Sequence, residues 1–302
     1  MKAGGPRVTA LGGGHGLSVT LSAIRRYAAA VTAVVSVADN GGSSGRLREA
    51  TGIPAPGDLR RCLGALADPD SVWSQAFEYR FGGEGELAGH ALGNLLIAVL
   101  TEVTGDFATA IEHAARLLHV EGRVVPATTV PVDVVARIDG VDVVGQVNVT
   151  GSHGRIERLS LSPPDAPAPP EAVEAVIAAD QVILGPGSLY TSVLAASVGE
   201  ELRAAIAKRG GGRVFVANVR AVEPEAGGYR AHEQLRVLLD HGVVVDAMLY
   251  DPASGTPPVG DLGAEVDGVR CVAAPVSRPD GAEHDPAALA GALAALWEGG
   301  PR

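Results

Sequence analysis

A glycine-rich turn near the N-terminus has the composition of a phosphate-binding site. It follows the apolar run at 8–11, which indicates a buried strand, and it precedes residues with helical apolar spacing. Glycine lets the backbone approach a ligand closely, and a following helix directs unpaired N–H groups at the turn. Leu17 stands where the dinucleotide fingerprint has its third glycine, and no Gly-Lys-Ser/Thr of a P-loop follows. A tight turn without a ligand is the alternative. The predicted phosphate-binding residues are Gly12, Gly13, Gly14, His15 and Gly16.

A second turn of this kind follows the apolar run at 181–184. Ser188 is predicted to cap the next helix, which carries Thr191. In open α/β sheets, ligands bind outside the carboxyl ends of the strands, so two such turns are expected to flank one crevice. Because Gly-x-Ser-x-Gly is absent here, no nucleophile elbow is predicted and hydrolase chemistry loses support. The turn residues predicted to bind the ligand are Gly185, Pro186, Gly187 and Ser188.

Polar residues follow the second predicted strand, in what we expect to be a long loop at 38–57. Asp39 is placed to accept hydrogen bonds from ribose hydroxyls or to ligate Mg²⁺. Arg46 adds a cation for a phosphate or carboxylate. We expect the loop to supply a mobile run of N–H and hydroxyl donors, with a surface linker as the alternative. Its other predicted ligand-binding residues are Asn40, Gly41, Gly42, Ser43 and Ser44.

Four further residues complete the predicted site. Asp58 is expected to be a helix N-cap, while Arg60 in the first turn is unfavourable for the helix dipole and therefore suggests an anion nearby. His90 and Asn94 are four residues apart, so they are expected to share one helix face. Capping and packing are the alternative roles. The His and Cys spacing predicts no zinc site.

The elements that must position these residues alternate between strand and helix, which predicts a Rossmann-like, doubly wound, mostly parallel sheet in three layers. We expect a single α/β domain over 1–302, with a helical segment at 57–119 and a β-rich insertion at 121–162. Strands are expected at 123–125, 132–138, 141–149, 156–161 and 243–249, with a hairpin turn at Asp139-Gly140.

Net charge and hydropathy limit the classes of partner that we expect for this chain. A formal net charge of -11 disfavours nucleic-acid binding, although local backbone amides can still hold a small anion. The chain has no apolar signal-peptide core and no apolar run near the ~18 residues of a membrane span, so we expect a cytoplasmic protein without membrane contact. Whether it forms a homo-oligomer stays open.

Together these motifs resemble the bacterial gluconeogenesis factor family (YvcK-like), within the CofD-like, 2-phospho-L-lactate transferase superfamily. The matching segments, in the same order, are 11–18, 37–48, 56–60, 79–81, 89–95, 104–106, 122–126 and 184–192. The resemblance implies a Rossmann-like fold, UDP-sugar binding, and a role in cell shape and wall-precursor control during gluconeogenic growth. It also adds Asn218 to the ligand site.

The sequence departs from the family pattern in two places. Asn40 stands where family members usually have a second Asp, which weakens a Mg²⁺ site there, and 222–226 replace a Gln-Pro-Gly-Glu-Thr run. The resemblance also leaves an enzyme as the alternative: a transferase that moves a phospholactyl-type group from a guanosine-diphosphate-linked donor to a deazaflavin, with Mg²⁺. No catalytic residue is assigned. An NAD(P) enzyme is disfavoured by the incomplete fingerprint.

Overall fold

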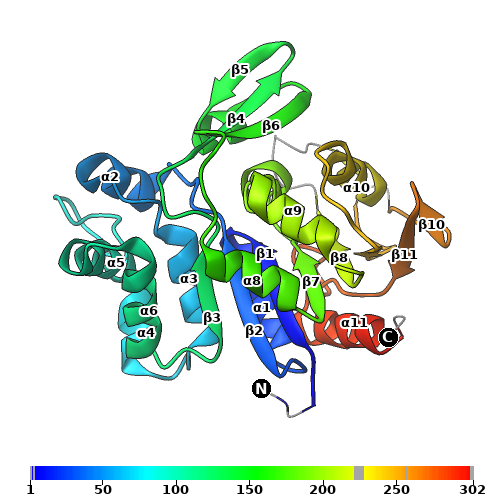
Figure 1. The fold of residues 1–302 in the computed structure, drawn as a ribbon, viewed down its shortest axis with the longest axis horizontal. Coiled ribbons are helices and arrows are strands. Elements are labelled where there is room, and N and C mark those ends of the chain that lie inside the picture. Colours follow the sequence, from blue (N-terminus) through cyan, green and yellow to red (C-terminus); the bar gives the residue numbers. More distant parts are fainter. Residues whose placement is uncertain (1, 3, 221–227, 256–257, 300–302) are drawn as a thin grey trace.

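The computed structural model describes residues 2, 4–220, 228–255 and 258–299, which are built around an eight-stranded sheet (Figure 1). The strand order is β10-β11-β9-β8-β7-β1-β2-β3, and all neighbours are parallel except the edge pair β10 and β11. The predicted α/β fold with a mostly parallel sheet is therefore confirmed. The strands are β1 (Arg7–Gly12), β2 (Ala30–Val35), β3 (Arg123–Pro126), β7 (Gln181–Leu184), β8 (Arg213–Val216), β9 (Ala247–Tyr250), β10 (Glu265–Val266) and β11 (Val269–Ala273).

The order of the strands places a crevice between β1 and β7. All residues of β7, β8 and β9 are buried, as expected for parallel strands covered on both faces. The chain runs outward from β1 through β2 to β3, then returns to the other side of β1 and runs outward through β7, β8 and β9. The direction thus reverses between β1 and β7, where open α/β sheets bind their ligands.

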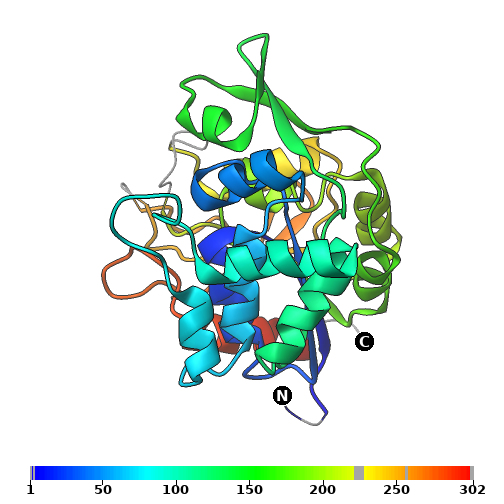
Figure 2. The same ribbon diagram turned by 90° about the vertical axis from the view of Figure 1, so that its left-hand side faces the viewer.

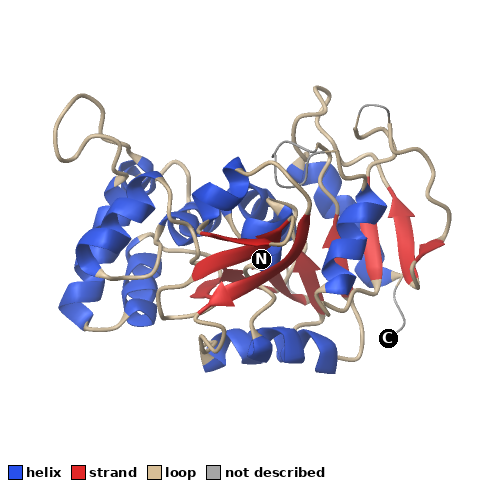
Figure 3. Ribbon diagram, turned by 90° about the horizontal axis from the view of Figure 1, so that it is seen from above, coloured by secondary structure: helices blue, strands red, loops and turns tan. Residues whose placement is uncertain are grey.

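Helices cover both faces of the sheet (Figure 3). Helix α1 packs against α3 and α11, while α8 packs against α9. The expected helical segment contains α3 to α6, which lie on the side turned toward the viewer in Figure 2. No helix in the described part of the chain has the length and hydropathy of a membrane span. The bounds are α1 (Gly14–Ile24), α3 (Gly57–Leu66), α4 (Val72–Glu78), α5 (Leu92–Thr104), α6 (Phe107–Leu117), α8 (Pro170–Ala178), α9 (Glu200–Lys208), α10 (Ala231–Asp240) and α11 (Pro286–Glu298).

A three-stranded antiparallel sheet, in the order β5-β4-β6, projects from this body (Figure 1). It comprises β4 (Asp133–Ile138), β5 (Val141–Val144) and β6 (Ile156–Ser162), with α7 (Gln146–Gly151) after β5. The predicted hairpin turn is confirmed, since Asp139 and Gly140 both have positive φ, 48° and 79°. The predicted insertion was wrong in one respect: residues 123–125 belong to β3, which pairs with β2 in the main sheet.

Three other sequence-based assignments were wrong. The expected loop at 38–57 contains α2 (Gly42–Thr51), which Gly52 ends in the left-handed conformation. The expected strand at 141–149 ends at Val144, because Gly145 (φ 93°) turns the chain into α7. The expected strand at 243–249 begins only at 247, because Val243 folds back and donates its N–H to the carbonyl of Leu238 at the end of α10.

Candidate functional site

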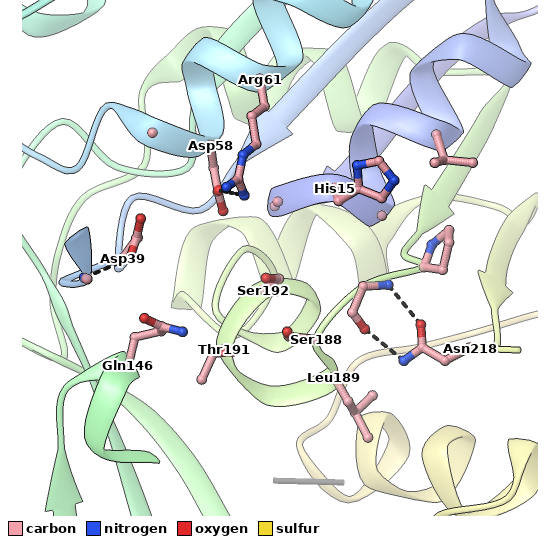
Figure 4. Close-up of a pocket in the computed structure, with 18 of the residues that line it drawn as sticks. His15, Asp39, Asp58, Arg61, Gln146, Ser188, Leu189, Thr191, Ser192 and Asn218 are labelled. Carbon is pink, nitrogen blue, oxygen red and sulfur yellow. Dashed lines mark hydrogen bonds and ion pairs between the residues drawn. The ribbon is translucent and has the colours of Figure 1, made fainter. Parts of the chain in front are cut away.

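The two glycine-rich turns line one cavity of about 740 Å³ at the carboxyl edge of β1 and β7 (Figure 4). This volume is in the usual range for small-molecule sites. The turns approach each other so closely that a Cβ atom at Gly16 would lie 2.3 Å from the carbonyl oxygen of Pro186. Only glycine fits at position 16, and the structure brings together the two segments that the sequence analysis placed around one crevice.

Three helices begin at the wall of this cavity. Gly14 in α1, Gly42 and Ser43 in α2, and Gly57 in α3 all line it. First-turn N–H groups have no partner within their helix, and the N-terminus carries the positive end of the helix dipole. The cavity is therefore well suited to an anion such as a phosphate. The prediction that Asp58 is the N-cap was wrong. Pro56 is the N-cap and α3 begins at Gly57, so Asp58 is the second residue of the helix.

Asn218 shapes the turn after β7. Its Oδ1 accepts the N–H of Gly187 at 3.0 Å, and its Nδ2 donates to the Gly187 carbonyl at 2.8 Å. Ser188 then begins a short helical segment, Leu189–Leu194, in which Val193 donates its N–H to the Ser188 carbonyl five residues earlier. Asn218 lines the cavity, but both polar atoms of its side-chain amide bind Gly187 and so fix the conformation of the turn.

Ser43 joins two of the predicted ligand residues. Its hydroxyl oxygen lies 3.0 Å from His90 Nδ1 and accepts a hydrogen bond from Asn94 Nδ2 at 3.0 Å. His90 precedes the first residue of α5, so the predicted common helix face was wrong, and the two side chains meet at Ser43 instead. Burial, with smaller effects of Arg46 and Arg80, lowers the pKa of His90 and favours a neutral imidazole. Arg46 donates to the carbonyl of Ala88 at 2.7 Å.

Two carboxylates, those of Asp39 and Asp58, lie in the same cavity (Figure 4). Asp39 accepts the N–H of Gly41 at 2.9 Å, and Asp58 lies 3.5 Å from the guanidinium of Arg61. Burial and the charge of Asp39 raise the pKa of Asp58 to about 6, against the opposing effects of Arg61 and of the Gly14 amide. A proton or a bound cation would relieve this repulsion.

Arg60 is buried in the wall and forms an ion pair with Glu78. Burial lowers the pKa of its guanidinium, although Glu78 acts in the opposite direction. Its Nε is buried and has no hydrogen-bond partner among the described residues. Arg61 and Arg80 also line the cavity, so three arginine residues contribute to its wall.

Several lining residues were missed in the sequence analysis. Gln146 comes from α7, which was expected to be strand. Glu283 and His284 precede α11, and Glu283 Oε1 lies 3.1 Å from His15 Nε2 in the first turn. Burial lowers the pKa of His284 to about 4, so its imidazole is neutral. No local motif marks these residues, because only the tertiary fold brings them to the cavity.

The predicted ligand residues divide into two groups. Those that line the cavity are Gly13, Gly14, His15, Gly16, Asp39, Gly41, Gly42, Ser43, Ser44, Asp58, Arg60, Asn94, Pro186, Gly187, Ser188, Thr191 and Asn218. Those outside its lining are Gly12, Asn40, Arg46, His90 and Gly185. The divergent segment 222–226 lies outside the described residues. Among the residues the structure describes, no group of three or more His, Cys, Asp or Glu could hold a metal.

Comparison with known proteins extends this picture. Residues 8–262 match the family described as 2-phospho-L-lactate transferase CofD. The chain is 40% identical to a putative gluconeogenesis factor of Mycobacterium leprae, over 95% of this chain and 85% of that protein. It is 39% identical to a gluconeogenesis factor of Bacillus subtilis, over 78% of this chain and 75% of that protein. The crystal structure of a UPF0052 family protein from Bacillus halodurans aligns with a TM-score of 0.90 at 34% identity, covering 97% of this chain and 99% of that one.

Proposed function

The chain belongs to the 2-phospho-L-lactate transferase CofD family and is similar over most of its length to gluconeogenesis factors, and on that premise we propose that it binds a nucleotide-sugar of the UDP-sugar type. In this proposal it is a cytoplasmic regulatory protein that acts in control of cell shape and cell-wall precursors during gluconeogenic growth.

The observation that carries the proposal is the convergence of α1, α2 and α3 on one cavity between two glycine turns. Their N-termini supply first-turn amides without a partner inside their own helix, and three positive dipole ends in one place. A pyrophosphate held at residues 13–16, beside the turn at 187–188, would lie against these helix starts. Because these donors are local and fixed, they can hold an anion despite the net charge of -11.

A Mg²⁺ ion fits beside such a pyrophosphate. Asp39 and Asp58 face the same cavity, and burial, together with the charge of Asp39, raises the pKa of Asp58. Mg²⁺ is usually held by one or two carboxylates together with ligand phosphates and water. Asp39 and Asp58 would hold the ion, which would supply charge neutralisation between them and the phosphates.

The same carboxylate pair favours a second candidate function, a transferase of the type that names the family. Its donor would be guanosine-diphosphate-linked and its acceptor a deazaflavin alcohol. This candidate requires turnover of these two substrates that depends on Mg²⁺. Binding of UDP-sugars without any such turnover would favour the regulatory protein.

The test of the proposed site is calorimetric titration with UDP-N-acetylglucosamine, with and without Mg²⁺. Gly14 has φ 61°, which asparagine tolerates better than other side chains do, and a Cβ there meets no atom closer than 3.8 Å. Gly14→Asn should therefore fold and place its amide where the phosphate is expected, so binding should weaken at least ~100-fold, as expected when an anion loses several first-turn donors.

Gly105→Asn is the matched control. Gly105 has φ 72°, ends α5 and has open space around its Cβ, away from the cavity. Gly105→Asn introduces the same strain of a side chain at positive φ without touching the site, so this variant should bind the ligand with the affinity of the unmodified protein. Equal affinity of both variants would remove the glycine turn from the binding site.

A further inference from the structure

We infer that Gln146 recognises a neutral amide or imide edge of the bound ligand, and that Asn40 is the residue that positions it. The inference rests on the proposed function, because it assigns the part of the nucleotide-sugar that lies away from the phosphates. The shared chemistry is a neutral planar group with one donor and one acceptor. The imide of a pyrimidine base offers the two side by side, and the acetamide of an N-acetylated sugar offers them on opposite sides.

The amide of Gln146 has unused hydrogen-bonding capacity at the cavity. Gln146 is the first residue of α7, it lines the cavity, and its Nε2 donates to Thr150 Oγ1 at 3.2 Å. Within the described part of the chain its Oε1 accepts no hydrogen bond, which leaves an N–H and a carbonyl oxygen for a ligand. Figure 4 shows the side chain pointing inward beside Asp39 and Thr191, at the opposite end of the view from Asn218.

The phosphates cannot be the partner of this amide oxygen. Oxygen atoms of phosphate accept hydrogen bonds only, and the unpaired amides that suit them belong to α1, α2 and α3. A neutral planar edge with one donor and one acceptor pairs well with a glutamine side chain, as glutamine does with adenine. Gln146 is therefore matched to the base, through two hydrogen bonds, or to an acetamido sugar, through one.

Asn40 holds α7 in the position that this contact requires. Its Oδ1 accepts the N–H of Val147 at 3.0 Å, in the first turn of α7. Its Nδ2 packs against Gly145, where a Cβ atom would lie only 2.4 Å away. Asn40 thus contacts the residues on both sides of Gln146 without lining the cavity itself. This gives Asn40, predicted from sequence to bind the ligand, a positioning role.

The insertion that carries Gln146 is tied to both halves of the main sheet. On one side, Arg48 of α2 forms an ion pair with Asp133 of β4 at 3.2 Å. On the other side, Leu159 of β6 donates its N–H to His241 Nε2 at 2.8 Å, next to the end of α10. Because one anchor lies on each side of the crevice, the insertion is held over it and the fold sets the position of Gln146 relative to the phosphate-binding turns.

The experiment is calorimetry with four probes: UDP-N-acetylglucosamine, UDP-glucose, UDP and inorganic pyrophosphate. Gln146→Ala should weaken binding of the probes that carry the recognised edge about tenfold, the effect of one or two neutral hydrogen bonds. Pyrophosphate binding should not change. Equal losses for UDP and UDP-N-acetylglucosamine identify the base as the partner, and a loss confined to UDP-N-acetylglucosamine identifies the acetamide.

Asn40 variants test the positioning role. Asn40→Ala should reproduce the loss seen in Gln146→Ala, and the double variant should lose no more than either single one. Asn40→Asp keeps the acceptor for the Val147 N–H and should bind like the unmodified protein. Gln75→Ala, on the exposed face of α4, is the matched control and should have no effect.

The outcomes separate the two proposals. If the unmodified protein binds none of the probes, the proposed function fails and takes this inference with it. If the unmodified protein binds the probes and Gln146→Ala binds each of them with the same affinity as the unmodified protein, the inference alone is overturned. It is also overturned if Asn40→Ala weakens pyrophosphate as much as it weakens the nucleotides, because that result would place Asn40 at the phosphates.

Discussion

At the scale of single residues, the carboxylate of Asp58 is held in an environment that disfavours its charge. Burial and Asp39 raise its pKa to about 6, even though Arg61 and the amide of Gly14 act in the opposite direction. This arrangement does not stabilise the fold, whereas carboxyl groups with strongly shifted pKa values in a cavity are typical of functional sites. The same feature makes the stability of the protein depend on pH.

We predict that Asp58→Asn stabilises the protein at neutral pH. A pKa raised from 3.8 to about 6 means that the folded state binds this proton more tightly than the unfolded state does. The free energy of unfolding should therefore fall as the pH rises through this interval, by up to roughly 3 kcal/mol. Urea unfolding at about pH 4.5, 6 and 7.5 should show this fall in the unmodified protein and a smaller fall in Asp58→Asn.

Asp165→Asn is the control for this prediction, because Asp165 is an exposed residue outside the cavity. It should leave the pH profile unchanged. The electrostatic interpretation of Asp58 would be wrong if Asp58→Asn lowered stability by the same amount at every pH, since that result would indicate a lost hydrogen bond. Added Mg²⁺ should stabilise the unmodified protein more at pH ~7.5, where Asp58 is ionised, than at pH ~5.

The residues found from sequence and those missed differ in what fixes their position. Gly13, Gly16 and Ser188 follow directly from strand ends, so a strand assignment is enough to place them. Gln146 and Glu283 reach the cavity from segments whose course depends on contacts far away in the chain. Asn40 holds α7, and His15 pairs with Glu283 across more than 260 positions, which no local pattern encodes.

At the scale of elements, the contacts that end an element were harder to predict than the elements themselves. Residues 141–149 alternate apolar and polar residues as a strand does, yet the strand stops where Gly145 takes φ 93°. Likewise, 243–246 carry strand-forming valines, but Val243 completes the turn after α10. Local strand propensity was outweighed in the first segment by the long-range hydrogen bond from Val147 to Asn40, and in the second by the local hydrogen bond from Val243 to Leu238.

An ion pair joins two neighbouring strands of the main sheet at their start. Arg213, the first residue of β8, donates through Nε at 2.8 Å and Nη2 at 2.6 Å to the two carboxylate oxygens of Asp246, just before β9. Burial raises the pKa of Asp246, but the bonds from Arg213 outweigh it and lower the pKa overall. The arginine side chain is only 10% exposed, so water cannot replace it.

We predict that Arg213→Met costs about 1–3 kcal/mol in the free energy of unfolding, because Asp246, whose side chain is 35% exposed, loses the guanidinium and keeps only the backbone N–H of residue 213. Arg213→Lys should cost less, since it keeps the charge and loses the two-point geometry. The control is Arg137→Met in the exposed pair with Asp142 of the hairpin, which should cost below about 1 kcal/mol. Equal losses for the buried and the exposed pair would contradict the assigned role.

At the scale of the whole molecule, the cavity gathers residues from nearly the entire chain. The first turn, α2, α3, α7, the segment after β7 and the residues before α11 all contribute to its wall. The alternation of strands and helices in the sequence predicted the fold class. It also predicted the edge at which the site lies, because parallel strands place their carboxyl ends at one edge of the sheet. The position of the β-rich insertion over the cavity and the contact of Glu283 with His15 could not be predicted from the sequence, because both depend on how distant segments pack.

This distribution leads to a prediction about ligand binding and local stability. Nucleotide-sugar binding should slow backbone hydrogen exchange at once in segments far apart in sequence, namely 13–17, 42–46, 146–150, 187–193 and 282–285. A ligand at ~100 times its dissociation constant adds about 2.7 kcal/mol to the free energy of unfolding. For a domain of this size, that should raise the melting temperature by roughly 5 °C.

Exchange mass spectrometry with and without UDP-N-acetylglucosamine measures this pattern, and α6 provides the internal reference because it does not line the cavity. Protection limited to 13–17 and 187–193 would mean that the ligand touches the two turns alone, so α7 and the residues before α11 would not belong to the site. Equal protection of α6 would indicate global stabilisation only. Protection in all five segments, with α6 unchanged, requires one ligand that bridges both halves of the sheet, because no single segment spans the crevice.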